Sequence, residues 1–95
     1  MWTRVTRFQF PPGDVAHAEG ELMRAVTSFR ESHDVERIDV LVNRQTGVAL
    51  AVSYWADYDA MRAASDDADE ARAEVALEAT GWVDRVEVFE VVERP

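Results

Sequence analysis

The segment Val35–Met61 constrains the fold more than any other part of the chain. Apolar residues alternate with polar or small ones on both sides of a polar turn at residues 43–47. That period of two is typical of β-strands, and Gly47 can take the positive φ that a hairpin turn needs. The second strand ends in Tyr54-Trp55, and Asp57 follows directly as a predicted helix N-cap. We therefore expect a β-hairpin that runs straight into a capped helix.

The flanking segments extend this order to β-α-β-β-α-β. Residues 2–10 are rich in β-formers and stop at Pro11-Pro12-Gly13, and residues 82–92 form a valine-rich last strand. Between residues 15 and 29, apolar side chains recur at steps of three and four, which predicts an amphipathic helix. Asp14 is its predicted N-cap.

The second helix is predicted to break and resume. Ser65-Asp66-Asp67 marks the break, and Ser65 or Asp66 is the expected cap of the second piece. Residues 68–79 continue it with the thin apolar edge of Ala71, Val75 and Ala79, and Gly81 is the expected C-terminal cap.

This order predicts one α+β domain over residues 1–95. The ferredoxin-like arrangement has a four-stranded antiparallel sheet with two helices on one face. The uncovered face would expose apolar side chains, and a twofold homodimer that stacks two sheets would cover them. On the second hairpin strand, one face carries the small residues Ala49, Ala51 and Ser53. They mark a place where a helix, a partner chain or a ligand comes close.

Composition excludes several functions. The chain of 95 residues has no cysteine, so disulfides, thiolate catalysis and zinc–thiolate sites are excluded. A net charge of −9 disfavours nucleic acid and anionic membranes as partners. No apolar run approaches the roughly 20 residues of a membrane span, and the N-terminus lacks an apolar signal core. Cytoplasmic residence is the resulting expectation.

The run Tyr54-Trp55-Ala56-Asp57-Tyr58-Asp59-Ala60-Met61 resembles a strand–helix corner of the dimeric α+β-barrel superfamily. Within it, the chain is similar to the antibiotic-biosynthesis-monooxygenase-like domains, over nearly its whole length in order and spacing. The resemblance implies either cofactor-independent oxygenation of quinol-like polyketides or haem degradation. Members often place a histidine on the second helix where this chain has Ala64, so we expect no haem and no other cofactor.

The resemblance makes three side chains candidate catalytic residues. Trp55 is expected either to donate its indole N–H to a substrate oxygen or to seal the strand–helix corner. Tyr58 offers a pocket hydroxyl or rim packing, and Asn43 offers an amide or ordinary turn chemistry. Arg7 and Tyr54 are candidate binding residues, with Arg7 placed to stabilise an anion.

Other polar residues have simpler interpretations. Arg7, Arg37 and Asp39 lie within strands, where they either form ion pairs across a dimer seam or line a polar pocket. His17 and His33 stand 16 residues apart, about 24 Å along a helix, so one chain cannot bring both to one metal. The cluster Asp66-Asp67-Asp69-Glu70 lacks the glycine spacing of a calcium loop. No metal site is predicted.

Two functions fit these features. The first is an oxygenase-like enzyme that acts on a small aromatic or polyketide-like substrate. The second is a non-catalytic dimer that binds a hydrophobic metabolite or a protein partner. An open apolar cavity with convergent polar groups would favour the enzyme, and a cavity closed by side chains would favour the alternative.

Overall fold

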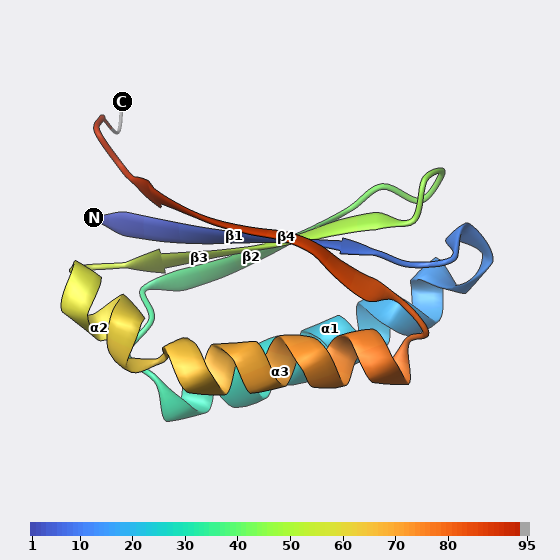
Figure 1. Ribbon diagram of the computed structural model, residues 1–95, viewed down its shortest axis with the longest axis horizontal. Helices are drawn as coiled ribbons and strands as arrows, with labels where there is room; N and C mark the ends of the chain where they lie inside the picture. Colours follow the sequence, from blue (N-terminus) through green and yellow to red (C-terminus); the bar gives the residue numbers. More distant parts are fainter. Residues whose placement is uncertain (94–95) are drawn as a thin grey trace.

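The computed structural model describes residues 1–93, which form two layers with the sheet on one side and the helices on the other (Figure 1). Residues 94 and 95, the end of the predicted domain, lie outside the described residues. The elements in chain order are β1 (Trp2–Gln9), the 3-10 turn η1 (Pro12–Asp14), α1 (Val15–Ser32), β2 (Arg37–Val42), β3 (Val48–Trp55), α2 (Tyr58–Ala63), α3 (Ser65–Glu78) and β4 (Trp82–Glu90).

The sheet has the strand order β2-β3-β1-β4, and every neighbouring pair is antiparallel. This confirms the predicted ferredoxin-like fold, with the helices on one face of the sheet (Figure 1). Thr6 stands opposite Ala51 on one side and Val86 on the other, which sets the register across three strands. β4 ends at Glu90 rather than at residue 92, and the Val91 amide still donates to the Met1 carbonyl at 2.8 Å, the next position of the same antiparallel register.

The main core lies between the sheet and the two long helices. Phe8 of β1 and Phe10, one residue beyond the end of that strand, stack with ring centroids 5.5 Å apart and are both buried. Leu22 of α1 and Val75 of α3 pack in the same cluster, and the hydrophobic burial of these side chains holds the helices to the sheet. Among residues 1–93, none of the helices has the length and apolar character to cross a membrane.

The predicted helix caps are only partly correct. Asp57 accepts a hydrogen bond from the Ala60 amide at 2.8 Å and caps α2 as expected. Asp14 occupies the N-cap of α1, but its side chain makes no capping bond. Its φ of −108° and ψ of 13° continue the 3-10 turn, whereas a capping side chain needs the extended backbone that Asp57 adopts.

The second helix breaks where predicted, but Ser65 and Asp66 do not cap the new piece. Ala64 is the N-cap of α3, and no side-chain cap bond is present. Ser65 instead accepts a hydrogen bond from Arg4, which comes from β1. The first residue after the break therefore connects the helical layer to the sheet through its hydrogen bond with Arg4.

Gly81 is not the left-handed residue that ends α3. Thr80 takes that conformation with φ 56°, and Gly81 donates its amide to the Ala76 carbonyl at 2.8 Å. A Cβ at Gly81 would lie 2.4 Å from the Phe10 ring. Glycine is required there because a core aromatic side chain approaches the backbone.

The helices leave much of β4 uncovered. Val86 and Val88 stand opposite the buried residues Thr6 and Arg4, so they share the helix side of the sheet. They are nevertheless 41% and 43% exposed, and Phe89 on the opposite side is 46% exposed. Apolar surface therefore remains on both faces of this edge strand.

Candidate functional site

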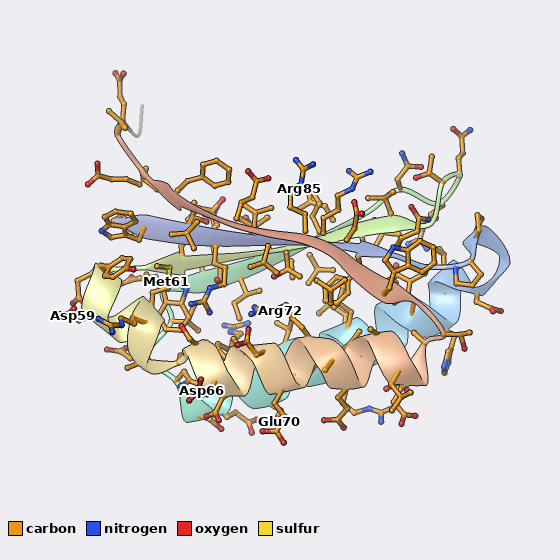
Figure 2. The ribbon with its side chains drawn as sticks, in the orientation of Figure 1. Asp59, Met61, Asp66, Glu70, Arg72 and Arg85 are labelled. Carbon is orange, nitrogen blue, oxygen red and sulfur yellow. The ribbon has the colours of Figure 1, made fainter. Side chains whose placement is uncertain are left out.

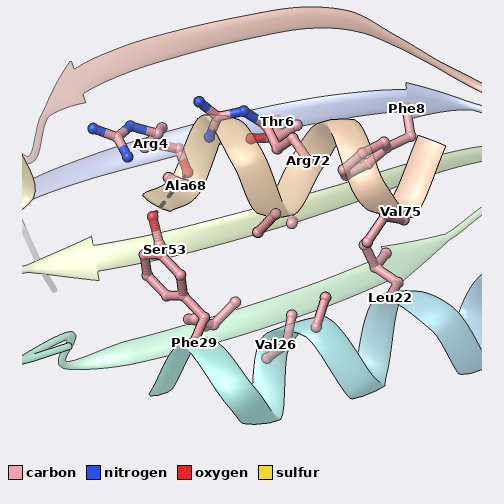
Figure 3. Close-up of a pocket in the computed structure, with 14 residues that line it drawn as sticks. Arg4, Thr6, Phe8, Leu22, Val26, Phe29, Ser53, Ala68, Arg72 and Val75 are labelled. Atoms are coloured by element: carbon pink, nitrogen blue, oxygen red, sulfur yellow. Dashed lines mark hydrogen bonds between the residues drawn. The ribbon is translucent and has the colours of Figure 1, made fainter. Parts of the chain in front are cut away.

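A cavity of about 70 Å³ lies between the sheet and helices α1 and α3 (Figure 3). It exceeds the roughly 10–15 Å³ that one water molecule occupies by the same kind of measure. Most of its wall is apolar: Phe8, Leu22, Ala25, Val26, Phe29, Ile38, Ala51, Ala68, Ala71 and Val75. Four polar side chains complete it: Arg4, Thr6, Ser53 and Arg72.

Small side chains on facing elements explain why the space is not filled. Ala51 and Ser53 of β3 face Ala68 and Ala71 of α3 across the layer, and all four line the cavity. From the sequence, the neighbour of this small face could be a helix, a partner chain or a ligand. The structure places helices over it and leaves the cavity between them.

Arg4 is the most buried charged residue of the described chain. It is 7% exposed, and its Nη2 donates to the Met61 carbonyl at 3.2 Å and to Ser65 Oγ at 2.9 Å. Burial lowers the pKa of Arg4 below its usual value, and the charge of Arg72 acts in the same direction. Asp69 and Tyr58 partly oppose this shift of the pKa.

Arg72 brings a second guanidinium to the same end of the cavity. Figure 2 shows it reaching from α3 into the layer beneath the sheet, whereas Glu70 points away from the sheet. Its side chain is 13% exposed and pairs with Asp69, whose own side chain is 70% exposed. Arg4 and Arg72 lie close together in Figure 3, while Phe8 and Val75 lie toward the other end. Positive charge thus predominates at one end of an otherwise apolar cavity.

The cavity adjoins a groove of about 340 Å³ between α1 and α3. Four residues line both spaces: Ala25, Phe29, Ala71 and Val75. Among the groove residues, His33 Nε2 lies 3.0 Å from Asp67 Oδ2, and this pair links the end of α1 to the start of α3. The His33 ring also packs on Phe29 with centroids 4.4 Å apart. The groove is the solvent-facing side of the cavity.

Trp55 supports the cavity wall from behind. It is 1% exposed and forms a second core cluster with Met61 and Ala64. Its Nε1–H donates to Ser53 Oγ at 2.9 Å, and its ring meets Phe29 edge-on at 6.0 Å. Trp55 itself does not line the cavity, but two residues that it contacts do.

Tyr58 and Asn43 lie at other places in the fold. Tyr58 is 45% exposed and packs edge-on against Trp2 at 5.1 Å. Asn43 Oδ1 accepts from the amides of Gln45 at 3.0 Å and Thr46 at 3.2 Å, which closes the hairpin turn. Neither side chain lines the cavity.

The candidate binding residues stand on the open face of the sheet. Arg7 pairs with Asp84 at 2.9 Å and shares a surface depression with Asn43. Tyr54 lies under Arg37, whose guanidinium carbon is 4.6 Å from the ring centroid. A side-chain hydrogen bond with Tyr54 and the charge of Asp39 raise the pKa of Arg37.

The in-strand charges pair within the chain. Arg37 Nη2 lies 3.0 Å from Oδ2 of Asp39, two residues along β2.

His17 lies near the opposite end of the helical layer from His33, with its Nε2 3.3 Å from the Glu78 carbonyl. Across residues 1–93, no three histidine, aspartate or glutamate side chains gather in a way that could hold a metal ion.

Sequence reasoning missed both cavity arginines. Arg4 has the same strand parity as Phe8 and Phe10, so it had to face the core. A charge at a core-facing position was therefore a usable signal. Arg72 gave no such signal, because a charged residue on a helix usually faces solvent.

Comparison with known proteins gives the fold but no sequence family. No protein-family model matches the chain, and no curated protein matches it significantly. A candidate antibiotic biosynthesis monooxygenase from Deinococcus radiodurans superposes with a TM-score of 0.79 at 16% identity, covering 100% of this chain and 96% of that one.

Two further structures are similar. SnoaB of Streptomyces nogalater, a cofactor-independent oxygenase solved as an alanine variant, gives a TM-score of 0.74 at 21% identity over 98% of this chain and 94% of its own. Rv0793 of Mycobacterium tuberculosis superposes with a TM-score of 0.72 at 18% identity, covering 98% of this chain and 96% of that one. The chain therefore has the fold of the antibiotic biosynthesis monooxygenase structures, as the strand–helix corner at Trp55 predicted.

Proposed function

We propose that this chain is a small-molecule enzyme of the cofactor-independent monooxygenase type, acting on a small aromatic or polyketide-like substrate. The observation that carries the proposal is the mostly apolar cavity whose lining includes four polar side chains. An apolar lining with a few polar groups is the usual lining of a small-molecule site. The fold shared with SnoaB adds support, because that protein is a cofactor-independent oxygenase.

The chemistry needs little from the protein. An electron-rich phenol or anthrone can itself reduce molecular oxygen: the CH₂ of the anthrone, or a ring CH of the phenol together with its O–H, loses two hydrogens, a new carbonyl forms, and the second oxygen atom leaves as water. The protein binds the substrate, favours loss of its proton and excludes solvent. Phe8 and Phe29 supply aromatic walls for these tasks. Trp55, Tyr58 and Asn43 stay the predicted catalytic residues, with Arg7 and Tyr54 as predicted binding residues, although none of these five side chains lines the cavity.

The proposed working unit is a homodimer. Leu41 is 50% exposed and Phe89 46% exposed, and both lie on the sheet face opposite the helices. Stacking two such faces would cover them around a twofold axis. The dimer would cover the Phe89 side of β4, and it would leave Val86 and Val88, which lie on the helix side of that strand, uncovered.

A non-catalytic binding protein is the second candidate. The indole N–H of Trp55 already donates to Ser53, and Asn43 is engaged in its turn. The sequence offers no histidine on α2 or α3 as a general base. These features fit a dimer that binds a hydrophobic metabolite without transforming it.

Oxygen uptake distinguishes the two. Purified protein is mixed with a hydroxylated anthrone in air-saturated buffer, and oxygen consumption is followed together with quinone absorbance. We expect protein-dependent consumption of one oxygen molecule per quinone formed. Filling the cavity with Ala51→Leu should abolish it, and Ala63→Leu on the exposed side of α2 is the matched control. Saturable binding without oxygen uptake would instead establish the binding protein.

A further inference from the structure

We propose that Arg4 and Arg72 form an oxyanion site at one end of the cavity, so that the ligand is an aromatic molecule bound through one ionised oxygen. The inference rests on the proposed use of the cavity for a small aromatic ligand and specifies its chemical class. The shared chemistry is an oxyanion, supplied either by a phenol or enol that ionises or by a carboxylate.

Arg4 has unused hydrogen-bond donors. Within residues 1–93 it makes hydrogen bonds only through Nη2, although a guanidinium carries five N–H donors in a planar fork. Every fully buried side-chain nitrogen or oxygen of the described residues has a partner. The remaining nitrogens of Arg4 are therefore not fully buried, and Arg4 is among the residues that line the cavity.

The charge balance at this end of the cavity is positive. Asp69 is the acidic partner of Arg72, and its carboxylate is mostly exposed, where water screens its charge. Burial and the charge of Arg72 both disfavour the cationic form of Arg4, which is shown by its lowered pKa. A bound oxyanion would favour the cationic form of Arg4, because it places an opposite charge beside the guanidinium in a poorly hydrated place.

General basicity of the surface does not explain the two arginines. The chain carries a net charge of −9, and acidic side chains predominate in the groove outside the cavity, where Arg24 and His33 stand among Glu21, Asp67, Glu70 and Glu74. A guanidinium buried in such a chain needs a local reason. Each guanidinium carries a planar fork of N–H donors that suits an oxyanion, and both arginines line the cavity.

Three probes of similar size test the site: nitrophenol, its neutral methyl ether nitroanisole, and benzoate. Nitrophenol absorbance reports its own ionisation, so binding is measured at a pH just below the pKa of the free phenol. We expect the phenolate fraction to rise on binding, with the released proton passing to the buffer. A carboxylate ligand would instead appear as tighter binding of benzoate, and either preference over nitroanisole supports the site.

The variants Arg4→Gln and Arg72→Gln should each weaken binding of the preferred anion about tenfold or more, since a charged partner loses a hydrogen bond. Nitroanisole affinity should stay unchanged. Arg30→Gln, on the exposed surface of α1, is the matched control and should alter neither. Arg4 also joins β1 to Met61 and Ser65, so thermal unfolding accompanies each variant, and Arg72→Gln gives an independent result if Arg4→Gln fails to fold.

The outcomes separate this inference from the proposed function. If nitrophenol and nitroanisole bind equally and the arginine variants bind like the parent protein, the oxyanion site is wrong while the ligand cavity stands. If no probe binds saturably, both the oxyanion site and the use of the cavity for a small aromatic ligand are wrong. If the anion binds through the arginines but no anthrone consumes oxygen, the oxyanion site stands and the oxygenase proposal fails.

Discussion

The side chains of Trp55 and Ser53, two residues apart on β3, are joined by a hydrogen bond in which the indole Nε1–H donates to Ser53 Oγ at 2.9 Å. Trp55 is buried, and Ser53 lines the cavity. The tryptophan thus fixes one polar group of the cavity wall and leaves its own N–H no free direction toward a ligand. This geometry favours the corner-sealing interpretation of Trp55.

Trp55→Phe tests that interpretation because it keeps an apolar ring and removes the N–H. We expect the free energy of unfolding to fall by about 1–2 kcal/mol, the usual cost of a core substitution that retains an aromatic side chain. Nitrophenol affinity should stay nearly unchanged. Chemical denaturation and ligand titration measure the two quantities. Unchanged stability with sharply weakened binding would contradict the prediction and make Trp55 a ligand donor.

Asp57 and Asp14 form a matched pair for helix capping. Asp57→Ala removes the bond to the Ala60 amide and should destabilise the protein by about 0.5–2 kcal/mol. Asp14 stands at an N-cap without a side-chain bond, so Asp14→Ala should change stability by no more than about 0.5 kcal/mol. Urea denaturation of both variants measures the difference. An equal loss at both positions would show that the distinction between them is wrong.

Gly47 and Gly20 should respond in opposite directions to alanine. Gly47 has φ 79°, and a Cβ there would lie 2.1 Å from the Phe10 carbonyl oxygen. The left-handed conformation alone costs an alanine about 1–2 kcal/mol, and the contact adds to it. Gly20 lies within α1 with nothing within 4 Å of an added Cβ, so Gly20→Ala should stabilise by about 0.5–1 kcal/mol. Melting temperatures that move in the same direction would refute this contrast.

Light scattering tests the proposed homodimer. We expect a mass twice that of the 10.7 kDa chain at micromolar concentration. Leu50→Glu places a charge at the centre of the open sheet face, opposite Arg7 and Leu41, and should give monomers. Leu77→Glu, at a 78% exposed position on α3, should leave the dimer intact. A monomeric parent protein would overturn the dimer.

Much of the fold could be predicted because it depends on local patterns. The alternation from Ile38 to Trp55 and the turn glycine at Gly47 predicted the hairpin, and the capped break before Ala68 predicted the divided helix. Errors occurred where a tertiary contact changed a local preference. Ser65 accepts from Arg4 rather than capping α3, and Gly81 is needed for the Phe10 ring rather than for a positive φ.

The candidate site was less predictable for the same reason. Periodicity tells which residues share a face, so the small face at Ala51 and Ser53 was visible in the sequence. It does not tell how closely two elements approach or which charges meet between them. The cavity exists because α1 and α3 pack over that face without filling it, and Arg4 comes near Arg72 only because α3 covers the sheet that contains β1.

The sequence by itself determined the order of elements, the ferredoxin-like sheet and the strand–helix corner at Trp55, since each follows from side-chain period, turn chemistry and capping over a few residues. Only the tertiary structure decided where a ligand can bind. Residues 68 and 72 of α3 line the cavity together with residues of β1 and β3 that lie more than a dozen positions earlier in the sequence. Packing between such distant segments depends on the shapes of all the side chains between the layers.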